Sequence, residues 1–123
     1  MKGNIGYIQI TTFNSTTTDE FTDALDWMRE KNIKKIILDL RNNGGGLVSS
    51  SVEIAQQIVK KGKIIDVKFR DTKYNVTYES KLDKPEFDFA VLVNEHTASA
   101  SEILASAIQD SKGGTLIGTK TFG

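Results

Sequence analysis

The sequence predicts an α/β fold in which a mostly parallel sheet packs against flanking helices, with one β-hairpin. Short apolar runs alternate along the chain with segments that carry apolar residues at helical spacing. The run over 35–40 (Lys-Ile-Ile-Leu-Asp-Leu) is almost continuously apolar, as in a central strand covered on both faces. Strands that alternate with helices are typical of parallel sheets joined by crossover connections.

The first strand and the first helix are expected near the start of the chain. Residues 6–10 alternate like a half-buried strand. Thr17 and Glu20 have capping-box spacing, which predicts a helix that reaches about residue 32. The strand over 35–40 follows this helix. The buried stripe of the helix is expected to consist of Phe21, Ala24, Leu25 and Met28.

A second helix and a hairpin are expected in the middle of the chain. Ser50 and Glu53 have the spacing of another capping box, for a helix that ends near residue 61. Two β-type runs, 64–69 and 74–79, are separated by a polar turn and predict the hairpin. The positions expected to face inward in this helix are Val52, Ala55, Ile58 and Val59.

One more strand, a helix and a final strand complete the pattern. The run over 89–93 is apolar, and a third helix is expected from Ser99 to about residue 110. A glycine pair at 113–114 breaks this helix before a last strand over 115–118. The expected order is therefore strand, helix, strand, helix, hairpin, strand, helix, strand.

Composition limits the functions to consider. The 123 residues suit one domain, and 16 acidic residues balance 16 basic ones, so nothing indicates a nucleic acid partner. The chain has no cysteine and one histidine, which excludes disulfides and argues against a zinc site. No apolar run approaches the roughly 18 residues of a membrane span. We therefore expect no metal, no cofactor and no nucleic acid partner.

A glycine run at 44–46 directly follows a predicted strand. Glycine permits positive φ and lets backbone N–H groups approach a ligand closely, which suits an oxyanion hole or a phosphate nest. The run also fits a plain strand-to-helix turn. It is not a Walker loop, because no Gly-Lys-Ser/Thr sequence follows, and it lacks the spacing of a dinucleotide fingerprint.

Residues 94–103 are the most informative part of the sequence, because they place hydroxyl side chains between an apolar strand and a helix. The first N–H groups of a helix have no internal partners, and the helix dipole favours negative charge there. A serine alkoxide and an oxyanion would both be stabilised at such a position. If the strands over 35–40 and 89–93 lie near each other, the glycine run and the serine turn open into one crevice.

Residues 97–102 (Thr-Ala-Ser-Ala-Ser-Glu) resemble the nucleophile segment of the C-terminal processing proteases, also called tail-specific proteases, a family of serine peptidases. Residues 38–46 resemble their glycine loop, in which a proline often replaces Gly44. The opening Gly-Tyr-Ile with Phe13, and the segments 103–110 and 118–123, are similar to further parts of the family's catalytic core. The resemblance covers almost the whole chain and implies a ClpP/crotonase-like fold.

The resemblance also implies roles for individual residues. It places the nucleophile on Ser99 rather than on Ser101. Backbone N–H groups of Ala100 and of Gly45 or Gly46 would form the oxyanion hole. Asp110 matches a carboxylate of the family, with a possible supporting role, although a surface or structural ion pair is the other interpretation.

The general base of the family is a lysine in a Thr-Phe-Gly-Lys-Gly segment. Residues 121–123 match its first three positions, so the lysine would follow Gly123. Lys120 lies four positions too early, a shift that on a strand or turn would move its amine by roughly 10 Å, and it is expected to be a surface lysine. A serine without a neighbouring base is a weak nucleophile, so the 123 residues by themselves are expected to be inactive.

Nearby charged residues have structural interpretations. His96 lies three residues before Ser99, but a turn splays adjacent side chains apart, and we do not expect it to be the base. Glu102 is expected to complement the first turn of its helix. Asp39 and Arg41 are expected to form an ion pair or loop anchor at the end of their strand.

By resemblance, residues 1–123 form a single, partial protease catalytic core domain without the family's upstream PDZ domain and downstream lysine-bearing segment. The expected partner is a protein or peptide cut near its C-terminus. An extracytoplasmic setting is implied for the parent protein, although this chain carries no export signal. A surface exposed by truncation could also support a homo-oligomer. Two alternatives remain: a non-catalytic peptide-binding relative and a crotonase-like acyl-CoA enzyme.

Overall fold

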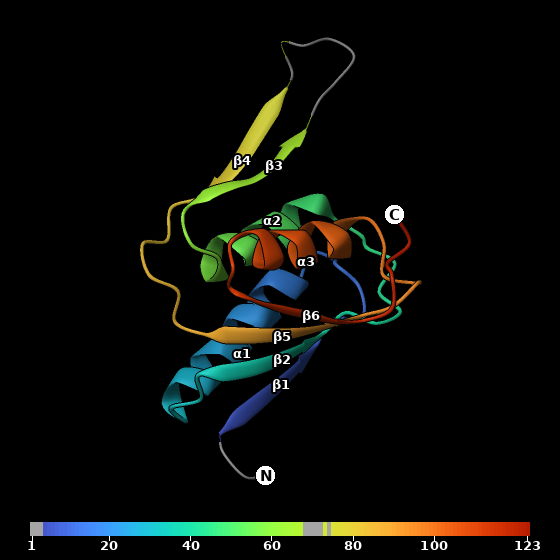
Figure 1. Cartoon of the computed structure of the whole chain (residues 1–123). Helices are drawn as coiled ribbons and strands as arrows, with labels where there is room; N and C mark the ends of the chain where they lie inside the picture. The colour runs from blue at the N-terminus through green and yellow to red at the C-terminus, as the bar shows by residue number, and fades with distance from the viewer. Residues whose placement is uncertain (1–3, 68–72, 74) are drawn as a thin grey trace.

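Four parallel strands form the main sheet of the computed structural model, which describes residues 4–67, 73 and 75–123. The strands β1 (Ile5–Gln9), β2 (Lys35–Asp39), β5 (Asp88–Val93) and β6 (Gly114–Gly118) lie side by side in the order β1-β2-β5-β6 (Figure 1). Their pairing is parallel throughout. The loops that follow β2 and β5 therefore leave the same edge of the sheet next to each other, as the sequence predicts.

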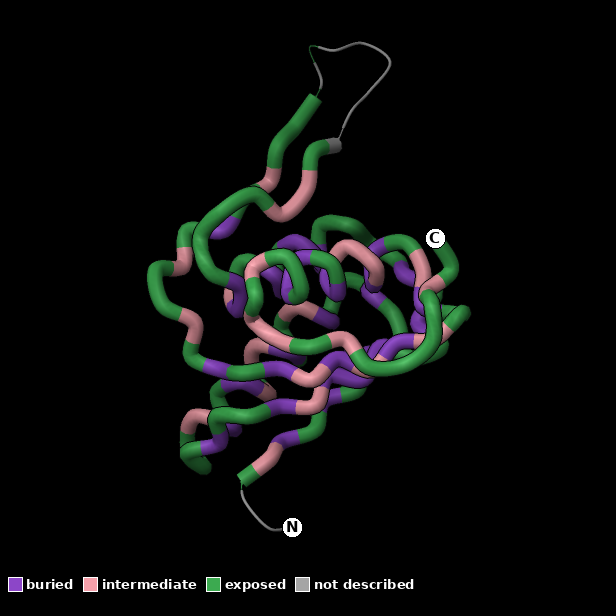
Figure 2. The backbone as a smooth tube through the Cα atoms, viewed as in Figure 1, coloured by how far each residue is buried: buried purple, intermediate pink, exposed green. Residues whose placement is uncertain are grey.

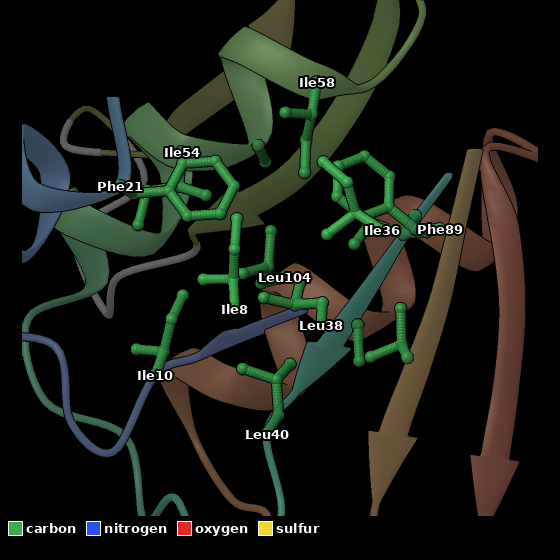
Figure 3. Close-up of a cluster of buried hydrophobic side chains, with 14 of the residues drawn as sticks. Ile8, Ile10, Phe21, Ile36, Leu38, Leu40, Ile54, Ile58, Phe89 and Leu104 are labelled. Atoms are coloured by element: carbon green, nitrogen blue, oxygen red, sulfur yellow. The ribbon is translucent and has the colours of Figure 1, made fainter. Parts of the chain in front are cut away.

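Three helices supply the other half of the core: α1 (Thr17–Glu30), α2 (Val48–Ile58) and α3 (Ala100–Asp110). Alternate strand side chains meet them in one cluster, in which Leu38, Ile54 and Leu104 are completely buried (Figure 3). Burying a side chain of this size contributes about 1.5–3 kcal/mol. The predicted inward positions of α1 and α2 are confirmed, apart from Ala24, which is only partly buried.

The opposite face of the sheet is more open than the sequence predicts. Burial alternates along β2 and β5, so that Ile37, Ala90 and Leu92 are only partly buried. Tyr7 and Ile117 are 52% and 49% exposed on this face. The expectation that β2 is covered on both faces is therefore wrong for the described residues, because all three helices contribute to the same core cluster.

The strands β3 (Gly62–Val67) and β4 (Val76–Ser80) pair in antiparallel fashion and confirm the hairpin. The hairpin projects from the body, and most of its described part is exposed (Figures 1 and 2). Ser80 ties its base to the core, because its buried hydroxyl donates to the Val59 carbonyl at 2.8 Å. Of the expected hairpin, residues 68–72 and residue 74, where the second strand is expected to begin, lie outside the described residues.

Neither predicted capping box opens its helix. Thr17 is the first helical residue of α1, and the entry is fixed by Asn14, whose side chain accepts from the Thr16 N–H at 3.0 Å. The second helix already begins at Val48, and Ser50 lies within its first turn. The helix starts before Ser50 because the loop is already fixed at Leu47, whose N–H donates to the Phe13 carbonyl at 2.8 Å.

Candidate active site

The glycine run and the serine turn are in direct contact at the edge of the sheet. A Cβ placed on Gly45 would lie 2.8 Å from the Ser99 Cβ, 3.0 Å from the Ala98 carbonyl oxygen and 3.1 Å from the Ala100 nitrogen. Gly45 also has a φ of +106°. Only glycine fits this position, so the loop after β2 packs its bare backbone against the turn after β5.

Ser99 has a backbone conformation that few residues other than glycine adopt. Its φ and ψ are +58° and −120°, and holding such a residue costs on the order of 1–3 kcal/mol. The turn is sharp because β5 ends at Val93 and α3 begins at Ala100, only a few residues later. The result is an exposed Ser99 side chain at the N-terminal end of α3, in a strand-to-helix turn similar to the nucleophile elbow of α/β-hydrolases.

In the serine turn and the glycine run, the backbone N–H groups of Ala100 and Gly46 have no protein acceptor among the described residues. The N–H of Gly45 differs, because it donates to the Asn43 side-chain oxygen at 2.8 Å. Free N–H groups at a helix start and in a glycine loop attract negative charge. The sequence left open which glycine donates to an oxyanion; of Gly45 and Gly46, only Gly46 has an N–H without an acceptor among the described residues.

Glu102 ties the serine turn to the end of the chain. One carboxylate oxygen accepts from the Ser99 N–H at 2.9 Å, and the other accepts from the Thr121 hydroxyl and the Gly123 N–H, both at 2.9 Å. The Phe122 N–H donates to the Thr97 carbonyl at 3.0 Å in the same region. Partial burial opposes ionisation of Glu102, but these hydrogen bonds outweigh it and lower its pKa.

Comparisons with known proteins agree with this geometry. The model of peptidase family S41 matches residues 4–123. The chain belongs to peptidase family S41. It is 44% identical over 121 residues to the carboxy-terminal processing protease CtpA of Bacillus subtilis (strain 168), a match that covers 98% of the chain and 26% of that protein.

Two further relatives support membership of this family of C-terminal processing proteases. A probable CtpA-like serine protease of Staphylococcus aureus (strain N315) is 39% identical over 125 residues, covering 99% of the chain and 25% of that protein. The solved photosystem II D1 C-terminal processing protease superposes with a TM-score of 0.84 at 37% identity, covering 97% of the chain and 31% of that structure. The α/β fold is therefore that of S41 proteases. The chain spans about a quarter of the length of the curated relatives.

In this S41 chain the predicted ion pair at the end of β2 is present and has an additional partner. The carboxylate of Asp39, 1% exposed, accepts from the Arg41 side chain at 2.9 and 3.0 Å and from the Tyr7 hydroxyl. The hydrogen bonds from Arg41 lower the pKa of Asp39 to about 2. The sequence did not predict the contact with Tyr7. Alternation of apolar and polar residues identifies a strand but does not indicate which residue an exposed side chain of that strand will contact.

Replacing Asp39 by asparagine is expected to lower the free energy of unfolding by about 1–2 kcal/mol at pH 7. Since the folded pKa is depressed, this stabilisation is present above pH 4 and is lost as the pH falls toward 2. Urea denaturation at pH 7 and near pH 2 measures the difference. Asp83→Asn is the control, because that carboxylate is 88% exposed; an equal loss at both pH values for Asp39→Asn would contradict the interpretation.

Four other polar residues near the S41 motif do not join Ser99 in the structure. Asp110 is exposed at the opposite end of α3, about 15 Å along the helix. His96 is exposed, with its Nε2 3.6 Å from a Glu95 oxygen. Lys120 is also exposed. Ser101 is completely buried, with its hydroxyl 2.6 Å from the Ala98 carbonyl oxygen, so it is a structural serine.

The part of the chain that the structure describes contains no cluster of three or more histidine, aspartate or glutamate side chains that could hold a metal ion. None of the helices formed by these residues is both long and apolar enough to cross a membrane.

Proposed function

We propose that this chain carries the nucleophile and the oxyanion hole of a serine endopeptidase that processes the C-termini of proteins. The observation that carries the proposal is the strained Ser99, exposed at the start of α3 and packed against the bare backbone of Gly45. Backbone strain of this kind clusters at active sites, where the surrounding structure maintains it. Ser99 also caps α3, and its side chain is exposed. Membership of the S41 family supports the same reaction.

The proposed reaction assigns a role to each of these groups. The Ser99 hydroxyl attacks the carbonyl carbon of the peptide bond while a base takes its proton. The carbonyl oxygen becomes an oxyanion that accepts hydrogen bonds from the Ala100 and Gly46 N–H groups, each worth about 3–4 kcal/mol in the transition state. The C–N bond then breaks, the amine leaves with the proton, and water hydrolyses the acyl ester on Ser99.

The base in this proposal is a lysine that follows Gly123 in the full-length protein encoded by the gene. Glu102 supports this assignment, because it binds both the Ser99 N–H and the Gly123 N–H. A side chain attached after Gly123 would thus start close to the serine turn. The 123 residues alone are expected to be inactive, since a serine needs a neighbouring base.

Resemblance to the C-terminal processing proteases also supports a proposal for the substrate and the setting. The full-length protein would bind unstructured C-terminal segments of proteins, with an upstream PDZ domain for capture, and would act outside the cytoplasm.

The partly exposed face of the sheet, with Tyr7, Ile37 and Ile117, is where a second copy or further parts of the protein would pack. Sedimentation of the 123-residue chain as a monomer at high concentration would count against the second copy.

Glu102→Gln in the full-length protein is expected to reduce kcat by about 10–100-fold, which corresponds to the loss of about one charge-assisted hydrogen bond. Both carboxylate oxygens accept hydrogen bonds, so the amide NH₂ of glutamine would face an N–H or hydroxyl donor. Steady-state kinetics on a peptide substrate measures the loss. Glu95→Gln, an exposed carboxylate on the same loop, is the matched control and should keep full activity.

Three proteins test the proposal: the 123-residue chain, the full-length protein, and the full-length Ser99→Ala variant, each incubated with an unstructured protein that has an apolar C-terminus. Cleavage only by the full-length Ser99 form is expected. Binding without cleavage by a folded full-length protein would instead favour the non-catalytic peptide-binding relative. Cleavage by the Ser99→Ala variant would refute the nucleophile assignment.

A further inference from the structure

Asn43 has a completely buried side chain at the centre of the proposed site. Its amide NH₂ donates to the Ile10 carbonyl at 2.8 Å, and its amide oxygen accepts the Gly45 N–H at 2.8 Å. Both ends of the amide are therefore in use. A buried polar group is retained only when its hydrogen bonds are satisfied, so this side chain is fixed in one orientation.

The backbone of Asn43 makes the connection to the serine turn. Its carbonyl oxygen accepts from the Ala98 N–H at 3.0 Å and lies 2.8 Å from the Ser101 hydroxyl. One residue thus joins the segment after β1, the glycine loop after β2 and the turn after β5. No other described residue forms hydrogen bonds to all three of these segments.

The hydrogen bond from Gly45 decides which N–H of the loop is available. Because the Gly45 N–H points to the Asn43 side chain, it is not free for a substrate oxygen. The next N–H, that of Gly46, has no acceptor among the described residues. The Gly45 carbonyl is also held, by the Phe13 N–H at 2.9 Å, so the whole peptide unit before Gly46 is fixed.

We infer that Asn43 is a positioning residue, whose side chain engages the Gly45 N–H and so presents the Gly46 N–H, together with that of Ala100, to the oxyanion. The inference rests on the proposed function and deepens it. Asn43 touches neither substrate nor the reacting atoms, and it acts through the glycine loop.

The chemistry of the position requires a neutral amide. Asparagine offers a donor toward Ile10 and an acceptor toward Gly45 in one rigid plane. Alanine would leave the Ile10 carbonyl and the Gly45 N–H without partners. Aspartate has the same shape but would place a carboxylate oxygen against the Ile10 carbonyl, so it should not restore the function of asparagine at neutral pH.

The first test is kinetic and uses the full-length protein. Asn43→Ala and Asn43→Asp are expected to lower kcat by about 30–300-fold at pH 8, close to the loss of one oxyanion donor, with KM changed less than threefold. A peptide boronic acid, which forms a tetrahedral adduct on serine, should bind more weakly by a similar factor. Binding of the uncleaved peptide, measured in a Ser99→Ala background, should not change.

Ser80→Ala is the matched control, because it also removes a buried side-chain hydrogen bond, at the base of the hairpin. It is expected to lower stability while leaving kcat within twofold. If the wild type is active and the Asn43→Ala variant keeps the same kcat and boronate affinity, the inference about Asn43 is overturned while the proposed function stands. A folded wild type without Ser99-dependent cleavage would overturn the proposed function and the inference with it.

A second measurement uses only the wild-type protein, so its result does not depend on whether a variant folds. Amide hydrogen exchange of the wild-type full-length protein, followed by NMR, should show the Gly45 N–H protected at least about 100-fold more than the Gly46 N–H. Equal, fast exchange at both glycines would show that Asn43 does not engage Gly45 in solution and would overturn the inference.

Discussion

Ser99→Ala in the full-length protein is expected to lower kcat by about 10⁴-fold or more, because it removes the atom that attacks the peptide bond. KM should change little, since the side chain is exposed and contributes little to binding. The measurement is steady-state cleavage of a peptide by the two proteins at equal concentration. Retention of more than about 1% of the activity would exclude Ser99 as the nucleophile.

Ser101→Ala is the matched control for that substitution, two residues along the same helix. Its hydroxyl is buried against the Ala98 and Asn43 carbonyls, so its loss should reduce stability by about 1 kcal/mol but leave Ser99-dependent chemistry in place.

A separate variant tests the strain at this position. Ser99→Gly should be as inactive as Ser99→Ala but more stable than it by about 1–2 kcal/mol, because glycine adopts a φ of +58° without cost. Urea denaturation of both variants measures this difference, and equal stability would indicate that the turn is not strained.

Gly45→Ala is expected to have the second largest effect, a loss of at least about 100-fold in kcat together with about 2–4 kcal/mol of stability. A Cβ there would lie 2.8 Å from the Ser99 Cβ and 3.1 Å from the Ala100 nitrogen, at a φ of +106°. The glycine loop and the serine turn would have to separate, and both parts of the oxyanion hole would move. Kinetics and chemical denaturation of the same protein measure the two losses.

Gly44→Ala is the natural control for that variant. It lies one residue earlier in the same run, and a Cβ there would meet no atom within 4 Å. Full activity and unchanged stability are expected. If Gly44→Ala were as damaging as Gly45→Ala, the loop would be sensitive to any side chain, and the specific contact with Ser99 would not explain the effect.

The order of elements and the meeting of the two loops could be predicted from the sequence, because hydrophobic periodicity and parallel topology determine both. The glycine run follows β2 and the serine turn follows β5, and these strands are neighbours. The first residues of the helices were less predictable. The capping-box spacing predicted that the second helix starts at Ser50, but a tertiary hydrogen bond of Leu47 ends the loop earlier, and the helix starts at Val48.

The roles of Asn43 and Glu102 could not be read completely from the sequence. Asparagine after a strand is common in turns, and nothing in its neighbours reveals that its side chain reaches Ile10 and Gly45. The expected role of Glu102 in the first turn of α3 is confirmed by its bond to the Ser99 N–H. Its bonds to Thr121 and Gly123 depend on where the chain returns after β6, which local patterns do not encode.

The measurement that tests the central claim most directly is the intact mass of the full-length protein after acid quenching of its reaction with a p-nitrophenyl peptide ester. We expect a burst of one equivalent of p-nitrophenol per active site and a mass increase equal to the acyl group, mapped by peptide digestion to Ser99. An acyl group on any other residue, or turnover without any covalent adduct in the Ser99 protein, would contradict it.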